Sequence, residues 1–119
     1  MTDGFGPGCA IMDDAHVYKV NEVIALLDRL HGQTIRIAGG LGLGFEGVSI
    51  WHIPKSECLP GYSSSLWADF DLDAIGYSLE QLGKFNARHV VVAATVNRDH
   101  QGHFSLWPAS VLIRSITKG

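Results

Sequence analysis

The sequence predicts a mostly β domain: a small β-barrel of five or six strands, with an N-terminal amphipathic α-helix and a short helix between strands three and four. Residues 90–96 form a nearly unbroken run of β-branched and small apolar side chains, typical of a strand that is buried on both faces or curves through a barrel. Shorter alternating segments precede this run, and a polar turn and further apolar residues follow it. With 119 residues, 46% of them hydrophobic, the chain can bury one core without metal or disulfide support.

The N-terminal helix is predicted from apolar residues at helical spacing, which follow the capping acids Asp13 and Asp14. Gly32 is expected just beyond its C-terminal end. The segment before the helix is rich in glycine, so we expect a flexible tail over residues 1–12 and a single domain over residues 13–119. The apolar stripe of the helix consists of Val17, Val20, Val23, Ile24, Leu27 and Leu30.

Turn-forming residues separate the predicted strands. Pro54 ends the second strand, and Ser78 with Gln81 has the spacing of a capping box, which begins a helix through Phe85. The glycine-rich segment 39–47 predicts a sharp bend or bulge in a curved sheet. The predicted strands are 34–38, 48–53, 66–72 and 90–96, followed by a turn over 97–103, a returning strand through Trp107 and a last apolar run ending at Ile116.

Charge and cysteine content limit the classes of partner and compartment. The net charge is −3 and the nine basic residues are scattered, which disfavours a nucleic-acid partner because phosphate binding needs clustered cations. Two cysteines do not form a disulfide framework, so free thiols in a reducing compartment are expected. No signal sequence and no apolar run of roughly 20 residues is evident. We therefore expect a soluble cytoplasmic protein with no membrane association.

Two motifs match ligand-binding patterns in the wrong context. Residues 42–47 fit G-x-G-x-x-G, but a strand follows where a dinucleotide-binding turn needs a helix, so a glycine-permitted strand bend is favoured. Asp69, Asp71 and Asp73, with Glu80, copy the ligand spacing of a calcium-binding loop. The required glycine is replaced by Ala74, and the first two acids alternate with apolar residues as on a solvated strand face. We expect no cofactor.

A zinc site is the remaining metal hypothesis. His100 and His103 lie in the predicted turn, and His52 or Cys58 could complete a site only if the fold brings distant segments together. Histidines in turns more often hydrogen-bond to the backbone. Cys58 lies in a predicted loop with no evident group to orient a catalytic histidine. No set of nucleophile, base and orienting group emerges, so we do not expect an enzyme.

Three tryptophans lie on the otherwise polar faces of their predicted strands. Strict alternation pairs Trp51 with Ser49, Trp67 with Asp69 and Asp71, and Trp107 with His103 and Ser105. The interior is then expected to hold Val48, Ile50, Phe70, Phe104 and Leu106. Two interpretations stay open. The favoured one is that the tryptophans receive the apolar stripe of the N-terminal helix; the other is a recognition surface for bases, sugars or a protein.

The segments IRIAGGLGLGFEGVSIW, SLWADFDL and VVAATVNRDHQGHFSLWPASVLIRSI carry a resemblance that covers about residues 17–116. The pattern is a strand after a helix-ending glycine, a strand of aromatic and acidic residues, and a GHF-like turn that closes a hairpin. It resembles a group of small uncharacterised bacterial proteins of the oligonucleotide/oligosaccharide-binding barrel (OB-fold) type. The resemblance implies a binding groove across the second and third strands and supplies no catalytic residues.

The expected function is that of a non-enzymatic binding module. Its partner is expected to be another protein or a second copy of the chain, as for an accessory or inhibitor subunit, and an acidic aromatic face suits a basic partner. The alternatives are single-stranded nucleic-acid binding, disfavoured because the acids repel phosphates, and metal binding through His100 and His103. The expected binding surface consists of Trp51, Trp67, Asp69, Asp71, Tyr62 and Trp107.

Overall fold

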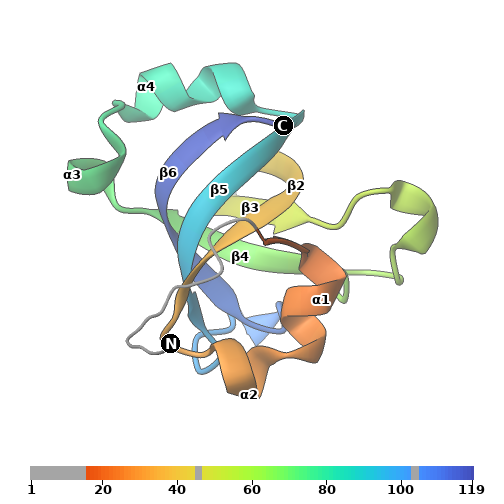
Figure 1. The fold of residues 1–119 in the computed structure, drawn as a ribbon. Helices are drawn as coiled ribbons and strands as arrows, with labels where there is room; N and C mark the ends of the chain where they lie inside the picture. The colour runs from red at the N-terminus through yellow and green to blue at the C-terminus, as the bar shows by residue number, and fades with distance from the viewer. Residues whose placement is uncertain (1–15, 45–46, 103–104) are drawn as a thin grey trace.

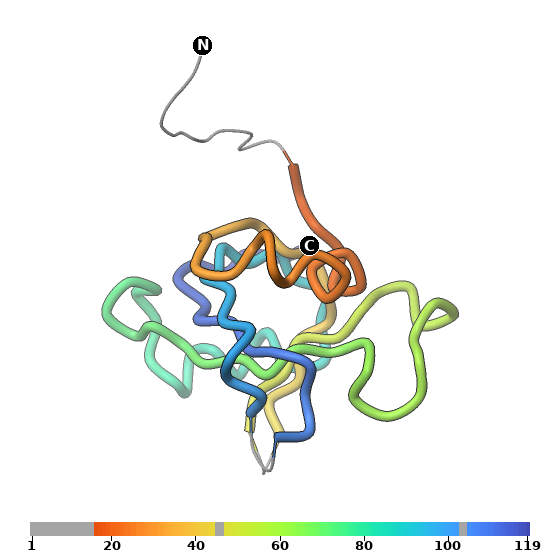
Figure 2. Tube along the Cα trace, turned by 90° about the horizontal axis from the view of Figure 1, so that it is seen from below, coloured from red at the N-terminus to blue at the C-terminus, as the bar shows by residue number. Residues whose placement is uncertain are grey.

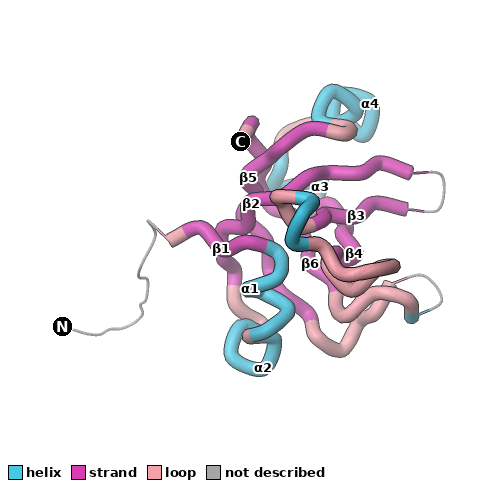
Figure 3. The backbone as a smooth tube through the Cα atoms, turned by 90° about the vertical axis from the view of Figure 1, so that its right-hand side faces the viewer, coloured by secondary structure: helices cyan, strands magenta, loops and turns pink. Residues whose placement is uncertain are grey.

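The computed structural model describes residues 16–44, 47–102 and 105–119. Within these ranges six strands form one sheet in the order β1-β2-β3-β4-β6-β5, and β2 also pairs with β5, so five of the strands close into a ring (Figures 1 and 3). The strands are β1 (Val17–Lys19), β2 (Thr34–Gly44), β3 (Gly47–Trp51), β4 (Ser65–Phe70), β5 (Arg88–Asn97) and β6 (Ser110–Lys118). The mostly β prediction is confirmed.

The helices are short and lie between consecutive strands of the chain. In the described part of the chain, none has the length and apolar character needed to cross a lipid bilayer. As predicted, helical segments lie between the third and fourth strands of the ring, and a capping box of Ser78 and Gln81 begins one of them. The helices are α1 (Val20–Ala25), α2 (Leu27–Leu30), η2 (Lys55–Glu57), α3 (Leu72–Ile75), α4 (Leu79–Leu82) and η3 (Gly83–Phe85).

The predicted N-terminal helix is shorter than its apolar pattern suggests. Residues 17–19 form strand β1, which runs parallel to Arg36–Ala38 of β2, and the helix then breaks at Leu26 into α1 and α2. Strand β2 extends beyond β3, so its edge there has backbone groups that β1 can pair. Helix formation across residues 17–19 would leave this edge uncovered. The capping acids Asp13 and Asp14 and the tail 1–12 lie outside the described residues.

Helices close the two ends of the ring. Figure 1 shows α4 at one end of the strands and α1 with α2 at the opposite end. In Figure 2 the segment after η2 (yellow-green) and the α3 segment (green) project on opposite sides. One core cluster contains the inward-facing strand residues together with Val20, Val23, Leu30 and Leu82 of these helices. The stripe of the N-terminal helix therefore packs into the interior. The favoured interpretation, that it covers the tryptophan face, is wrong.

The barrel core consists of side chains at alternate strand positions. Ile50 is fully buried, as predicted, whereas Val48 and Phe70 are half-buried near the ends of their strands. Leu106 was expected inside and is 48% exposed, and Phe104 lies outside the described residues. The fully buried core residues on strands include Ile37, Leu41, Ile50, Leu66, Val90, Val92, Ala94 and Ile113.

The returning strand predicted through Trp107 does not form. Between β5 and β6 the described residues make turns and a short helical turn; Gly102 has φ +74° and Ser105 has φ +55°. Pro108 also lacks the backbone donor that a central strand needs. The chain pairs again only from Ser110, opposite Asn97. Trp107 is therefore held by a loop and is not placed by strand alternation.

Strand β4 ends at Phe70, two residues before the predicted end at Leu72. Asp71 instead caps α3, where its carboxylate accepts a hydrogen bond from the backbone N–H of Ala74 at 3.3 Å. A bulge between β5 and β6 leaves Arg114 unpaired in the ladder. Its guanidinium donates to Thr95 Oγ1 at 3.0 Å and to Asp71 Oδ2 at 3.3 Å. Both carboxylate oxygens of Asp71 therefore accept hydrogen bonds within the fold, and Asp71 does not belong to the predicted binding face.

Candidate functional site

The outer face of β3 and β4 brings together most of the predicted binding residues. In the antiparallel register Ser49 lies opposite Trp67, and Trp51 lies opposite Ser65. Paired residues point to the same side of a sheet, and the neighbours Ile50 and Leu66 point inward. Trp51, Trp67 and Asp69 therefore share this face. We call the outer surface of β3 and β4, together with Tyr62 and Trp107, the aromatic face.

Trp51 lies on glycines of the adjacent strand. It is paired with Gly40, and a Cβ built on Gly40 would overlap its indole, while a Cβ on Gly42 would lie 2.6 Å from Cζ3 of the same ring. Such separations are shorter than real Cβ contacts allow. The glycine-rich segment is therefore part of one long strand that supports a flat indole. The pairing of residues 39–44 with β3 and β5 is continuous, so no bulge interrupts this part of the strand.

Trp67 stands in a cluster of aromatic rings next to further glycines. The centroid of Trp107 is 4.9 Å from that of Trp67 in an edge-to-face arrangement, and Tyr62 lies 4.4 Å from Trp107. Cβ atoms on Gly47 or Gly102 would collide with the Trp67 ring. The indole N–H of Trp67 donates to Asp69 Oδ1 at 3.3 Å. The aromatic face is thus packed and ordered by its own contacts.

Trp107 contributes to the aromatic face from beneath. It is 9% exposed, so the expectation that it points outward from a strand is wrong. Its Nε1 is buried and has no hydrogen-bond partner among the described residues. Tyr62 remains 44% exposed above it. The solvent-accessible rings of the face are therefore Trp51, Tyr62 and Trp67.

His52 fixes the segment that follows β3. Its side chain is 3% exposed; Nδ1 accepts from the backbone N–H of Asn21 at 3.1 Å, so the ring proton lies on Nε2, which donates to Glu57 Oε1 at 2.7 Å. The Cys58 thiol donates to the His52 carbonyl at 3.2 Å. Both ring nitrogens are thus occupied by protein partners. His52 connects α1 with the 52–64 segment and is not available as a metal ligand.

The other metal candidates are not gathered into a site. His100 Nδ1 lies 3.0 Å from Ser110 Oγ, and His103 lies outside the described residues. Among the residues that the structure describes, no three His, Cys, Asp or Glu side chains could hold one metal ion. Asp69 belongs to β4 and Asp71 caps a helix, so the calcium-like spacing corresponds to no binding loop. The hairpin at Gly44 and Gly47 likewise joins two strands, as the sequence predicted for the G-x-G-x-x-G segment.

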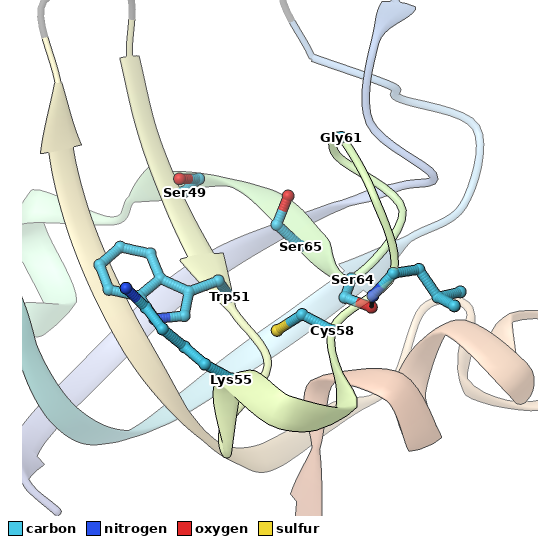
Figure 4. A pocket seen from close by; sticks show the side chains of 8 residues that line it. Ser49, Trp51, Lys55, Cys58, Gly61, Ser64 and Ser65 are labelled. Atoms are coloured by element: carbon cyan, nitrogen blue, oxygen red, sulfur yellow. Dashed lines mark hydrogen bonds between the residues drawn. The ribbon is translucent and has the colours of Figure 1, made fainter.

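Two grooves border the aromatic face. The first groove has a volume of about 430 Å³ and lies between the outer face of β3 and the 52–64 segment (Figure 4). Its lining residues are Ser49, Trp51, Lys55, Cys58, Leu59, Gly61, Ser64 and Ser65. The second groove has a volume of about 220 Å³ and lies between β4 and the α3–α4 segment. Its lining residues are Gly47, Val48, Trp67, Ala68, Asp69, Phe70, Leu72 and Leu79.

The hydrogen bond that Glu57 accepts from His52 makes the 52–64 segment sensitive to acid. The hydrogen bond from His52 lowers the pKa of Glu57 below its usual value of 4.5; slight desolvation opposes this effect, and the charge of Lys19 adds to it. A lowered pKa in the folded state means that ionised Glu57 stabilises the fold above pH 4.5, and that this contribution is lost as the pH falls through the folded-state value.

We therefore expect the replacement Glu57→Gln to lower the melting temperature near neutral pH and to have a progressively smaller effect below pH 4.5. The effect is modest because the carboxylate is exposed. Melting curves of both proteins from about pH 7 to about pH 3 measure it. A difference that stays constant over this range would show that the charge of Glu57 does not support the segment.

Comparisons with known proteins give a likeness of fold. No protein-family model matches the chain, and no curated protein matches it. One similar solved structure is a crystal structure described as an aspartyl-tRNA synthetase from Leishmania major Friedlin, with a TM-score of 0.51 and 14% sequence identity. The match covers 87% of this chain and 20% of that chain, so this chain corresponds to about one fifth of the synthetase.

Proposed function

We propose that the chain is a non-enzymatic binding module of the OB-fold class. The support is the closed order β2-β3-β4-β6-β5, with β4 and β6 parallel, all other ring pairs antiparallel, and helices between β4 and β5. The similar segment of the tRNA synthetase supports the same class. In this class the second and third strands of the ring carry the ligand, flanked by the loop between the fourth and fifth. Here these elements are β3, β4 and the segment with Trp107.

The proposed ligand is a short single-stranded nucleic acid that stacks its bases on the aromatic face. The observation that carries this proposal is a pair of half-buried indoles: Trp51 packs across Gly40 and Gly42, and Trp67 packs against Gly47. Aromatic rings bind bases of any sequence because every base has a π-face, with about 1–3 kcal/mol per stacked base. The name of the similar synthetase places its activity on tRNA, which agrees with a nucleic-acid ligand.

Tryptophan fluorescence tests this proposal directly. Titration with a single-stranded oligonucleotide is expected to quench the emission, and Trp51→Ala and Trp67→Ala are each expected to weaken binding about 5- to 100-fold. Since Lys55 is the one basic residue lining the two grooves, the dependence of log K on log salt should be shallow, with a slope of about −0.7. Absence of quenching at low salt would refute the proposal; a slope of about −4 would place the contacts elsewhere.

A protein partner is the second candidate, and the second groove favours it. Leu72 and Leu79 line this groove and are 43% and 65% exposed, and the one charged side chain there is that of Asp69. An apolar groove with a single carboxylate fits a partner segment that carries a basic residue next to an apolar one. Asp69→Lys is expected to abolish such a complex, whereas oligonucleotide binding should become tighter because a carboxylate that repels phosphate is replaced by a cation. Unchanged partner capture by this variant would exclude this groove.

A further inference from the structure

The first groove offers hydrogen-bond donors without acceptor partners. Lys55 makes no ion pair with any described residue, and no described residue hydrogen-bonds to Ser49 Oγ or to the indole N–H of Trp51. The Ser64 hydroxyl accepts from the backbone of Leu59 and keeps its proton for a further bond. No carboxylate lines the groove. Its free groups therefore match an acceptor-rich, anionic ligand.

The arrangement of these groups places the cation beside the aromatic ring and the hydroxyls across the groove. Figure 4 shows Trp51 and Lys55 at one side of the groove and Ser64 and Ser65 at the other, with the sulfur of Cys58 directed toward Trp51. The indole is supported by Gly40 and Gly42, so it cannot fold away without leaving its contact with β2. The volume of about 430 Å³ falls in the range of about 300–1,000 Å³ that is typical of small-molecule sites.

The second groove differs in charge, and this difference limits the length of an anionic ligand. Asp69 is exposed at its edge, and the other lining residues are apolar or glycine, apart from the indole N–H of Trp67, which donates to Asp69. A phosphate is repelled there and attracted to Lys55 in the first groove. Strong phosphate contact is thus confined to one end of the aromatic face.

We infer that the first groove is a subsite for one nucleotide, with the base stacked on Trp51 and the phosphate next to Lys55. The nucleotide is either free or the phosphorylated end of a strand. This inference rests on the proposed function. It adds the position of one base, a single phosphate contact and a preference for the phosphorylated end of a strand. A terminal phosphate presents close to two negative charges to Lys55, whereas an internal phosphodiester presents one, so a phosphorylated end should bind more tightly.

Alkylation of Cys58 reports occupancy of this groove. The chain has two cysteines, so Cys9→Ser leaves Cys58 as the single thiol. Adenosine monophosphate is expected to slow its reaction with iodoacetamide in a saturable manner, and adenosine should bind about tenfold more weakly because it lacks the charge-assisted contact. Lys55→Met should reduce the affinity for the monophosphate to that for adenosine, and Trp51→Ala should abolish protection by both.

Lys84→Met is the matched control, because Lys84 lies over the rings of Tyr77 and Phe85 and does not line the first groove. Equal effects of the two lysine variants, or no protection by millimolar monophosphate, overturn the inference. If an oligonucleotide still quenches tryptophan emission in that case, the proposed function stands without this subsite. Protection by the monophosphate without any oligonucleotide binding supports the subsite for a free nucleotide and refutes the proposed function.

Oligonucleotides with and without a 5′ or 3′ phosphate distinguish the two sources of the nucleotide. About tenfold tighter binding of one phosphorylated form, lost in Lys55→Met, assigns the groove to a strand end. Equal binding of all forms, with protection by the monophosphate retained, assigns it to a free nucleotide. Circular dichroism of each variant confirms that the fold is intact.

Discussion

Replacing Gly40 with alanine is expected to destabilise the protein by about 1–3 kcal/mol and to release Trp51 from the sheet. The added methyl group would occupy the space of the indole, which lies directly on the Gly40 backbone. The ring has to leave β2, and it then loses its contact with both glycines. The substitution therefore affects both the stability of the fold and the aromatic face, although it adds only one methyl group.

Chemical denaturation and tryptophan emission together measure this effect. A red shift of the emission is expected in Gly40→Ala, and the double variant Gly40→Ala with Trp51→Ala should be hardly less stable than Trp51→Ala alone. Gly83→Ala is the matched control: Gly83 has φ −55° and a Cβ there meets nothing within 4 Å, so this change should be neutral or stabilise by up to about 1 kcal/mol. Equal stability of Gly40→Ala and wild type would contradict the packing described for Trp51.

Replacing His52 with alanine is expected to cost about 2–4 kcal/mol of unfolding free energy. The ring is almost fully buried, so its removal leaves a cavity. The backbone N–H of Asn21 also loses its acceptor, and Glu57 loses its donor. Because these two bonds join α1 to the 52–64 segment, the wall of the first groove should loosen as well.

Thermal or chemical denaturation measures the stability loss, and the alkylation rate of Cys58 in the Cys9→Ser background measures the loosening. The rate is expected to rise, since the thiol hydrogen-bonds to the His52 carbonyl in the ordered segment. His89→Ala is the control, because His89 is exposed and its ring makes no hydrogen bond with a described residue. If both histidine variants had the same small effect, His52 would not be the anchor of this segment.

Local sequence patterns predicted the parts of the fold that depend on neighbouring residues. The strand at residues 90–96, the capping box at Ser78 and the end of a helix before Gly32 are all present. Alternation also placed Ile50 inside and Trp51 and Trp67 on the outer face. Periodicity is sufficient for these features because each is determined by burial along one element.

The errors arise where pairing between distant segments decides the structure. Residues 17–19 fit the helical stripe, but the free edge of β2 draws them into β1. Trp107 fits an alternating strand, yet its ring packs between Tyr62 and Trp67 from a loop. The glycines at 40 and 42 suggested a bulge, which does not form, because the sequence does not show that the Trp51 indole lies across them. One signal could have shown where the Trp51 indole lies. Two glycines stand at alternate positions of one predicted strand, and the next strand carries a tryptophan.

The most direct test of the aromatic face as the binding surface is a titration of 15N-labelled protein with a single-stranded oligonucleotide, followed through the indole and backbone N–H signals. Binding on the aromatic face predicts saturable shifts of the Trp51 and Trp67 indole signals and of the backbone signals of Ser49 and Ser65, with little change at Arg36 and Val91 on β2 and β5. Shifts that cluster on β2 and β5, or no shifts at all, would contradict it.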